Sequence, residues 1–274
     1  MTKQTDGATT TEVRHILGLS GGKDSTALAI YLRTRLPRIE YIFTDTGKEL
    51  PETYQYLDRL EAYLGKRIVR LNGARTFDEL LAARNGFLPS PKMRWCTQYL
   101  KIRPFEQYVG DDPAVSYIAI RVDERHRTGY ISTKPNIKAR YPFVEDGLTK
   151  QDILRILSDS GLGLPEYYRW RSRSGCFFCF FQQKAEWVGL LREHPDLFAE
   201  AMRYERVDQA TGERYTWQSG ESLEELARPE RVQQILEEKE RRNARARMRP
   251  NLPLLEVFSP DSDDEERACL ICHL

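Results

Sequence analysis

The sequence predicts an α/β protein: a parallel β-sheet with helices on both faces, and a helical appendix at the C-terminus. Apolar strand-like segments alternate with helical patterns over the first 160 residues, as βαβ units require. A Gly-rich turn at 20–25 joins the first strand to the first helix, where such sheets bind anions. The chain has 274 residues, 40% of them hydrophobic, so it can build a real core.

The elements follow in order along the chain. Strands are predicted at 13–19, 39–44, 66–71 and 115–121, where apolar runs lie between polar turns. Helices are predicted directly after Ser25 and at 52–64, 76–84, 149–160, 184–206 and 229–248. Thr149 and Asp152 resemble a capping box, and Pro195 breaks the helix in which it lies.

We divide the chain into a disordered tail at 1–12, a main domain at 13–184, a helical region at 185–250 and an acidic, Cys-containing tail at 251–274. No run of 18 apolar residues predicts a membrane span, and the polar N-terminus does not resemble a secretory signal. We therefore expect a cytoplasmic protein whose five cysteines are reduced thiols or ligands of a metal or cluster.

The overall charge of +1 does not indicate a nucleic-acid partner. Arginines nevertheless crowd 239–249, and acidic residues crowd 261–266. One interpretation is a solvated helix and an acidic loop that neutralise each other. The other is a basic surface for RNA, DNA or a ribonucleoprotein partner, although this stretch lacks the aromatic residues that would strengthen that case.

The segment SGGKDS at 20–25 is the strongest signal. Gly21 and Gly22 permit positive φ and let backbone N–H groups approach a phosphate, while Ser20 and Ser25 add hydroxyl donors. The following helix offers its N-terminal N–H groups and the positive end of its dipole.

Two charged residues complete this loop. Lys23 adds a positive charge, whereas Asp24 would repel phosphate and is expected to hold Mg²⁺ or to cap the helix. The Walker pattern GxxxxGK[ST] is absent, which excludes a P-loop NTPase.

SGGKDS resembles the PP-loop of the ATP pyrophosphatases. Further segments, in the right order over about 13–184, resemble the phosphoadenylyl-sulfate (PAPS) reductase family: FTDTGKELPET, WCTQYLKIRP, IRVDERHRT, YPFVEDGLTKQDILRIL and RSGCFFC. The intact loop is closest in character to members linked to DNA phosphorothioation or CRISPR systems. The resemblance implies that 13–184 is a nucleotide-binding domain whose fold is adenine nucleotide α-hydrolase-like, of the Rossmann type.

The resemblance also assigns site residues. Asp45, Thr46 and Gly47, at the end of the second strand, would contact the ribose or base, and Lys101 would join the nucleotide site. The other expected nucleotide contacts are Ser20, Gly21, Gly22, Lys23, Asp24 and Ser25.

Arg121, Arg125 and Arg127 follow a later strand and suit phosphates and a charged transition state. With Lys23 and Asp24, they form the expected catalytic set. Asp123 and Glu124 would assist a metal or orient the arginines. The alternative is a salt-bridged surface loop.

Cys96, Cys176 and Cys179 match three positions that bind a [4Fe–4S] cluster in some relatives. The family's adjacent Cys pair is Trp95-Cys96 in this chain, so one ligand is missing, and Cys269 or Cys272 could supply it. Such thiols hold a [4Fe–4S] cluster or Zn²⁺; the alternative is reduced thiols.

The favoured function is ATP cleavage between the α and β phosphates, with Mg²⁺, to AMP and pyrophosphate, by hydrolysis or by adenylation of a substrate. A PAPS or adenylyl-sulfate reductase is the second hypothesis, but the tail lacks the Glu-Cys-Gly-x-His segment of reductases, whose loops are also degenerate. The third is a non-catalytic nucleotide-binding subunit of a nucleic-acid modification or defence system.

Overall fold

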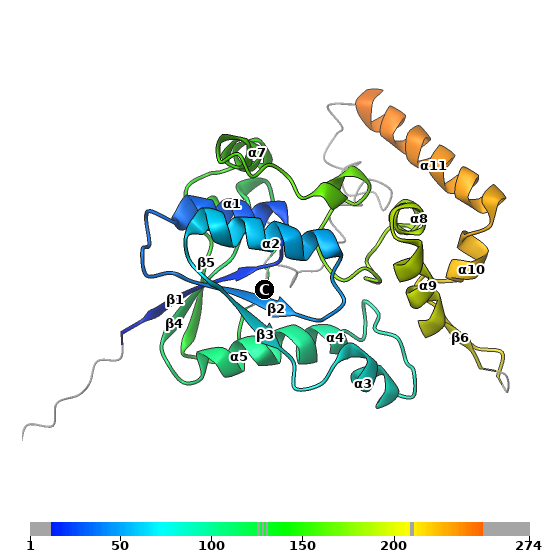
Figure 1. Cartoon of the computed structure of the whole chain (residues 1–274), viewed down its shortest axis with the longest axis horizontal. Helices are drawn as coiled ribbons and strands as arrows, with labels where there is room; N and C mark the ends of the chain where they lie inside the picture. Colours follow the sequence, from blue (N-terminus) through cyan, green and yellow to red (C-terminus); the bar gives the residue numbers. More distant parts are fainter. Residues whose placement is uncertain (1–11, 125–126, 128, 130, 209–210, 249–274) are drawn as a thin grey trace, which may run out of the picture.

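The computed structural model describes residues 12–124, 127, 129, 131–208 and 211–248. Its main sheet has five parallel strands in the order β3-β2-β1-β4-β5 (Figure 1). These strands are β1 (Arg14–Leu19), β2 (Glu40–Asp45), β3 (Ile68–Asn72), β4 (Ala114–Tyr117) and β5 (Ile137–Arg140). A short antiparallel pair, β6 (Arg206–Val207) and β7 (Arg214–Tyr215), lies in the C-terminal region.

Helices cover both faces of the sheet, which confirms the predicted fold class (Figure 1). One face carries α1 (Lys23–Leu32), α2 (Pro51–Leu64) and α7 (Lys150–Asp159). The other carries α3 (Phe77–Ala82), α4 (Trp95–Thr97), the π-helical turn η1 (Gln98–Ile102) and α5 (Arg103–Val109). Short connecting helices are η2 (Val122–Glu124), α6 (Pro142–Glu145) and η3 (Glu166–Arg169).

The C-terminal helices lie beyond the carboxyl ends of the strands (Figure 1). They are α8 (Lys184–Glu193), α9 (Pro195–Tyr204), α10 (Leu223–Leu226) and α11 (Pro229–Met248). As predicted, the chain breaks at Pro195, and Thr149 with Asp152 forms a capping box on α7. No described helix is both long and apolar enough to cross a membrane.

Two differences from the predicted elements have a physical cause. The predicted strand at 115–121 leaves the sheet after Tyr117, so 118–121 lies at the carboxyl edge instead. Strand β5 was not predicted, because it is an edge strand in which only Ile137 is buried. An edge strand with one buried residue has no apolar run to reveal it.

One hydrophobic cluster joins the main domain to the C-terminal region. It packs Leu50, Phe77 and Trp95 against Trp187 and Trp217. Phe77 stacks on Trp95 with ring centroids 5.1 Å apart. The boundary drawn at residue 184 therefore runs through a common core, while the predicted tails lie largely outside the described residues.

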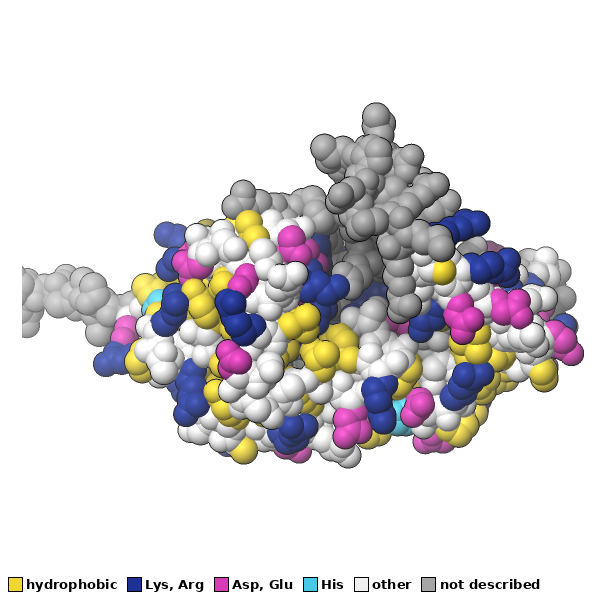
Figure 2. Space-filling view, turned by 90° about the horizontal axis from the view of Figure 1, so that it is seen from above, with side chains coloured by type: hydrophobic (Ala, Val, Ile, Leu, Met, Phe, Trp, Pro, Cys, Tyr) yellow, Lys and Arg dark blue, Asp and Glu magenta, His cyan; other side chains and the backbone are white. Residues whose placement is uncertain are grey.

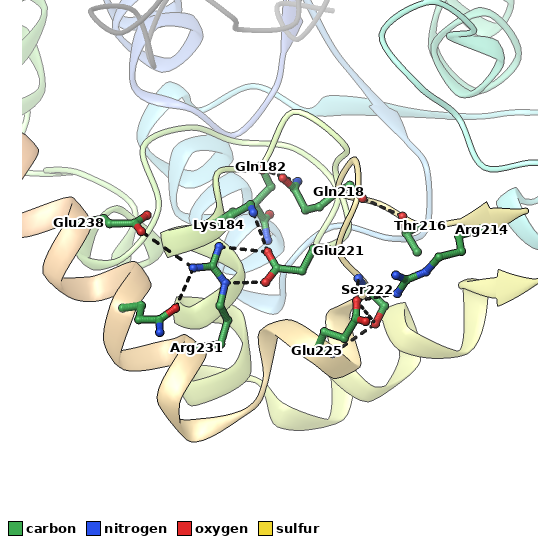
Figure 3. A network of polar contacts seen from close by, with 11 residues as sticks. Gln182, Lys184, Arg214, Thr216, Gln218, Glu221, Ser222, Glu225, Arg231 and Glu238 are labelled. Carbon is green, nitrogen blue, oxygen red and sulfur yellow. Dashed lines mark hydrogen bonds and ion pairs between the residues drawn. The ribbon is translucent and has the colours of Figure 1, made fainter.

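Glu221 holds the C-terminal helices together (Figure 3). Its carboxylate accepts hydrogen bonds from Lys184 of α8 at 2.6 Å and from Nε of Arg231 of α11 at 2.5 Å. The Arg231 hydrogen bond, helped by Lys184, lowers the pKa of Glu221.

We expect Glu221→Gln to lower the free energy of unfolding by about 1 kcal/mol at pH 7. The fold lowers the pKa of Glu221, so the ion pairs of Glu221 stabilise the protein fully above about 4.3, the pKa of a glutamate in an unfolded chain. This stabilisation is lost as the pH falls through the lower pKa of the folded state. Urea unfolding from pH 7 to pH 3 checks this, with the exposed Glu224→Gln as control. A loss that persists at pH 3 would contradict it.

Candidate active site

The site lies where β1 and β4 are neighbours in the sheet. The chain goes from β1 to β2 on one side and reaches β4 and β5 on the other, so the connections diverge there. Ligands of open α/β sheets bind in the crevice at this point, beyond the carboxyl ends of the strands. The SGGKDS segment follows β1, and 118–121 follows β4, so both border the crevice.

The two glycines of the loop serve different purposes. Gly21 has φ of +69°, and a Cβ there would lie 2.6 Å from Cγ2 of Thr53. Gly22, the N-cap of α1, has φ of −97°, so of the two glycines that permit a positive φ only Gly21 uses it. It is glycine because a Cβ would lie 2.8 Å from the Ser174 hydroxyl.

The two serines brace the loop from inside. Ser25 Oγ accepts the Ser20 N–H at 3.2 Å and lies 3.3 Å from the Gly22 carbonyl oxygen, to which it can donate. The Ser174 hydroxyl donates to Ser20 Oγ at 3.1 Å. Both serine side chains are buried, so they fix the loop's shape.

Asp24 and Arg121 connect the two edges of the crevice. Arg121 donates to Asp24 Oδ1 at 2.8 Å, and Lys23 Nζ lies 3.3 Å from Oδ2. Arg121 is only 3% exposed and also contacts Asp123 at 3.0 Å and Glu124 at 3.3 Å. Burial by itself would lower the pKa of Arg121, but these carboxylates outweigh it and raise the pKa above its ordinary value.

The loop that follows β4 contains salt bridges, as the alternative interpretation of a salt-bridged surface loop expects. Arg127 is buried and contacts Glu124 at 2.6 Å. Arg121 binds three carboxylates, which orient its guanidinium beside the phosphate loop. Arg125 lies outside the described residues.

A segment that the sequence did not flag covers the phosphate loop. Tyr167 and Tyr168 belong to η3. The Tyr167 hydroxyl donates to the Gly21 carbonyl at 2.7 Å, and the Tyr168 hydroxyl accepts the Lys23 N–H at 3.1 Å. Two tyrosines beside the RSRSGC segment were the available signal, but only the fold shows that they contact residues more than 140 positions away.

The DTG segment at 45–47 forms a tight turn after β2. Asp45 accepts hydrogen bonds from the Gly47 N–H and from the Tyr54 hydroxyl, both at 2.8 Å. Thr46 donates to Glu49 Oε1 at 2.8 Å. Glu49 is buried, and burial raises the pKa of its carboxyl group.

Cys176 lies against this turn. It forms an isolated antiparallel bridge with Glu49, and its Sγ is 3.2 Å from the Thr46 hydroxyl. Burial, followed by the nearby Glu49 carboxylate, raises the pKa of the Cys176 thiol well above its usual value, whereas the charge of Lys101 opposes this shift. Lys101 therefore faces Glu49 and Cys176 at this edge of the site.

Of the other four cysteines, the structure describes Cys96 and Cys179. The Cys179 N–H donates to the Cys176 carbonyl at 3.1 Å, and Cys96 packs against the same hydrophobic cluster as Cys176. Within the described residues, no group of three or more His, Cys, Asp or Glu side chains could hold a metal ion. Cys269 and Cys272 fall outside those residues.

The SGGKDS loop and the start of α1 carry the groups with which helix N-termini bind anions. The first N–H groups of a helix have no carbonyl partner within the helix, and α1 directs them at the turn that follows β1. Lys23 adds a positive charge beside them, and a glycine N-cap leaves no side chain in the way. Such an arrangement binds phosphate groups.

Comparisons with known proteins agree with this arrangement. Residues 14–157 match the model of the phosphoadenosine phosphosulfate reductase domain. Two uncharacterized proteins of Methanocaldococcus jannaschii are 28% and 25% identical to the chain, over 67% and 65% of it. These alignments span only 39% and 44% of the archaeal proteins, less than half of their length.

Two further similarities are to a phage protein and to a solved structure. An uncharacterized 37.8 kDa protein of Escherichia phage 186 is 26% identical, over 73% of this chain and 77% of its own. Among solved structures, PAPS reductase from Candida auris in its phosphate complex has 12% identity and a TM-score of 0.48, over 62% of this chain and 84% of that one. Since the domain model covers more than half of the residues, from β1 to α7, the chain belongs to the phosphoadenosine phosphosulfate reductase domain family.

Proposed function

We propose that the protein binds ATP and cleaves it between the α and β phosphates. Water or an acceptor group attacks the α-phosphorus, the bond to the bridging oxygen breaks, and pyrophosphate leaves. The observation that supports this most is the complete SGGKDS loop between β1 and α1, with Gly22 as the N-cap of α1 and Lys23 at its start.

Tyr168 supports the assignment of this loop to phosphates. Its hydroxyl oxygen accepts the Lys23 N–H, so an oxygen already occupies a position from which a phosphate oxygen would accept that bond. Binding of pyrophosphate would replace this contact. Lys23 and the first-turn N–H groups would then stabilise the charge that develops on the leaving group.

Asp24 is the carboxylate that this site offers to Mg²⁺, which proteins hold through one or two carboxylates together with substrate phosphates. When bound, the ion neutralises phosphate charge. Arg121 and Lys23 contact the two oxygens of Asp24, so a bound Mg²⁺ would have to replace one of these contacts.

We expect Lys23→Ala to reduce kcat for AMP formation by about 10²–10³, because one charged contact to the leaving group is lost. Chromatography of the nucleotides from Mg-ATP measures this, and Lys138→Ala, which removes an exposed lysine of β5, should retain full turnover. Unchanged turnover in a folded Lys23→Ala variant would contradict the assignment of Lys23 to the pyrophosphate leaving group.

Sulfonucleotide reduction is the alternative that the family match favours. That reaction needs a thiolate nucleophile, and the tail of this chain lacks the Glu-Cys-Gly-x-His segment in which reductases carry it. Cys269 and Cys272 follow the acidic run at 261–266, which would also disfavour a thiolate.

We therefore expect no sulfite when PAPS and reduced thioredoxin are supplied. A sulfite assay on the wild type and on Cys269→Ser/Cys272→Ser checks this. Sulfite from the wild type that disappears in the double variant would establish the reductase instead. Nucleotide binding without AMP or sulfite would indicate the accessory subunit.

A metal centre remains a further proposal, with Cys96, Cys176 and Cys179 in one site. The described residues alone do not complete such a site, so a fourth ligand must come from elsewhere, and Cys269 or Cys272 is the candidate. We expect iron with sulfide, or zinc, after anaerobic purification, and loss of that metal in Cys176→Ser/Cys179→Ser. Metal-free protein with full activity would rule out a required centre.

A further inference from the structure

A stretch of one charge sign lies between α3 and α5. Residues 80–105 contain five basic side chains and no acidic one: Arg84, Lys92, Arg94, Lys101 and Arg103. The net charge of +1 for the whole chain conceals this asymmetry. A run of basic residues without carboxylates attracts polyanions.

The arginines of this stretch stack on aromatic rings. The guanidinium groups of Arg84 and Arg103 lie 4.7 Å and 4.1 Å from the ring centroid of Tyr99. Arg84 also lies 4.8 Å from the ring centroid of Trp95. Stacking holds each guanidinium plane in place.

The β6–β7 hairpin extends the same surface. Arg206 lies 4.7 Å from the ring of Tyr215 and 5.7 Å from that of Phe87, which is 42% exposed. Trp95 Nε1 donates to the Phe87 carbonyl at 3.2 Å, which joins the hairpin group to the Tyr99 group. In Figure 1, α3, α4 and β6 lie on the same side of the molecule. We call these side chains the guanidinium–aromatic surface: Arg84, Phe87, Trp95, Tyr99, Arg103, Arg206 and Tyr215.

The Arg-rich helix α11 is different. There Arg241 lies 3.8 Å from Glu237, and Arg231 lies 3.9 Å from Glu238. Figure 2 shows basic and acidic side chains intermixed on the face that it presents. By contrast, among the described residues, Arg84, Arg103 and Arg206 form no ion pair with a carboxylate.

We propose that the guanidinium–aromatic surface binds single-stranded DNA. Arg84, Arg103 and Arg206 would contact phosphates, and the exposed ring of Phe87 would stack on a base. Base stacking requires unpaired bases, so the surface favours a single strand over a duplex. A DNA strand supplies both groups that this surface would contact, phosphates and unpaired bases, and no 2′-hydroxyl is needed for either contact.

Fluorescence anisotropy with a labelled 20-nucleotide oligo(dT), across a series of salt concentrations, tests this. We expect Arg103→Ala/Arg206→Ala to weaken binding at least about tenfold and to reduce the log–log salt slope by roughly 0.7 for each arginine. Phe87→Ala should weaken binding by about tenfold and leave the salt slope unchanged.

Matched controls distinguish the surface from general charge. Arg33→Ala removes an exposed arginine that stacks on Tyr63 at 5.1 Å, far from this stretch in sequence, and should leave binding unchanged. Lys23→Ala should also leave it unchanged, which separates this proposal from the nucleotide chemistry. Circular dichroism melting confirms that each variant is folded.

Three results would overturn the proposal: no binding of oligo(dT) at low salt, equal or tighter binding of the matching duplex, or an oligo(dT) affinity that neither Arg103→Ala/Arg206→Ala nor Phe87→Ala reduces. Displacement by heparin together with no effect of Phe87→Ala would reassign the surface to an acidic partner that does not stack.

Discussion

The buried ion pair between Arg121 and Asp24 is the interaction on which the site depends. An arginine that is 3% exposed must be paired with carboxylates, because an unpaired charge in the interior is very costly. Asp24 lies in the first turn of α1, and Arg121 follows β4, so their contact holds the two sides of the crevice together. It also fixes the Asp24 carboxylate beside Lys23. The position of the charged groups beside the phosphate loop therefore follows from this pairing.

A second constraint comes from 167–177. This segment contacts the phosphate loop through Tyr167, Tyr168 and Ser174, and it contacts the turn after β2 through Cys176. The Phe177 N–H donates to the Lys48 carbonyl at 2.8 Å, which adds a backbone bond to that turn. The cysteine segment and the nucleotide site are thus parts of one packed unit.

Charge is distributed unevenly over a nearly neutral chain. Arg121 is surrounded by ion pairs, and on α11 Arg231 and Arg241 each lie within 4 Å of a glutamate. The stretch 80–105 has cations alone, held in place by aromatic rings. Because screening limits each charge to a range of about 10 Å, the local pattern determines what each surface attracts.

The sequence by itself determined the strand–loop–helix unit at SGGKDS, the parallel α/β class and the capping box of α7, since apolar periodicity and turn chemistry act between near neighbours. It missed β5, whose edge position removes the apolar signal. It also named Arg121 and Asp24 separately without pairing them. Only the tertiary structure decided that Arg121 binds Asp24, 97 positions away, that Tyr168 covers the Lys23 N–H and that Ser174 requires Gly22. These contacts depend on which strands become neighbours in the sheet, and no local pattern encodes the partner of a side chain across that distance.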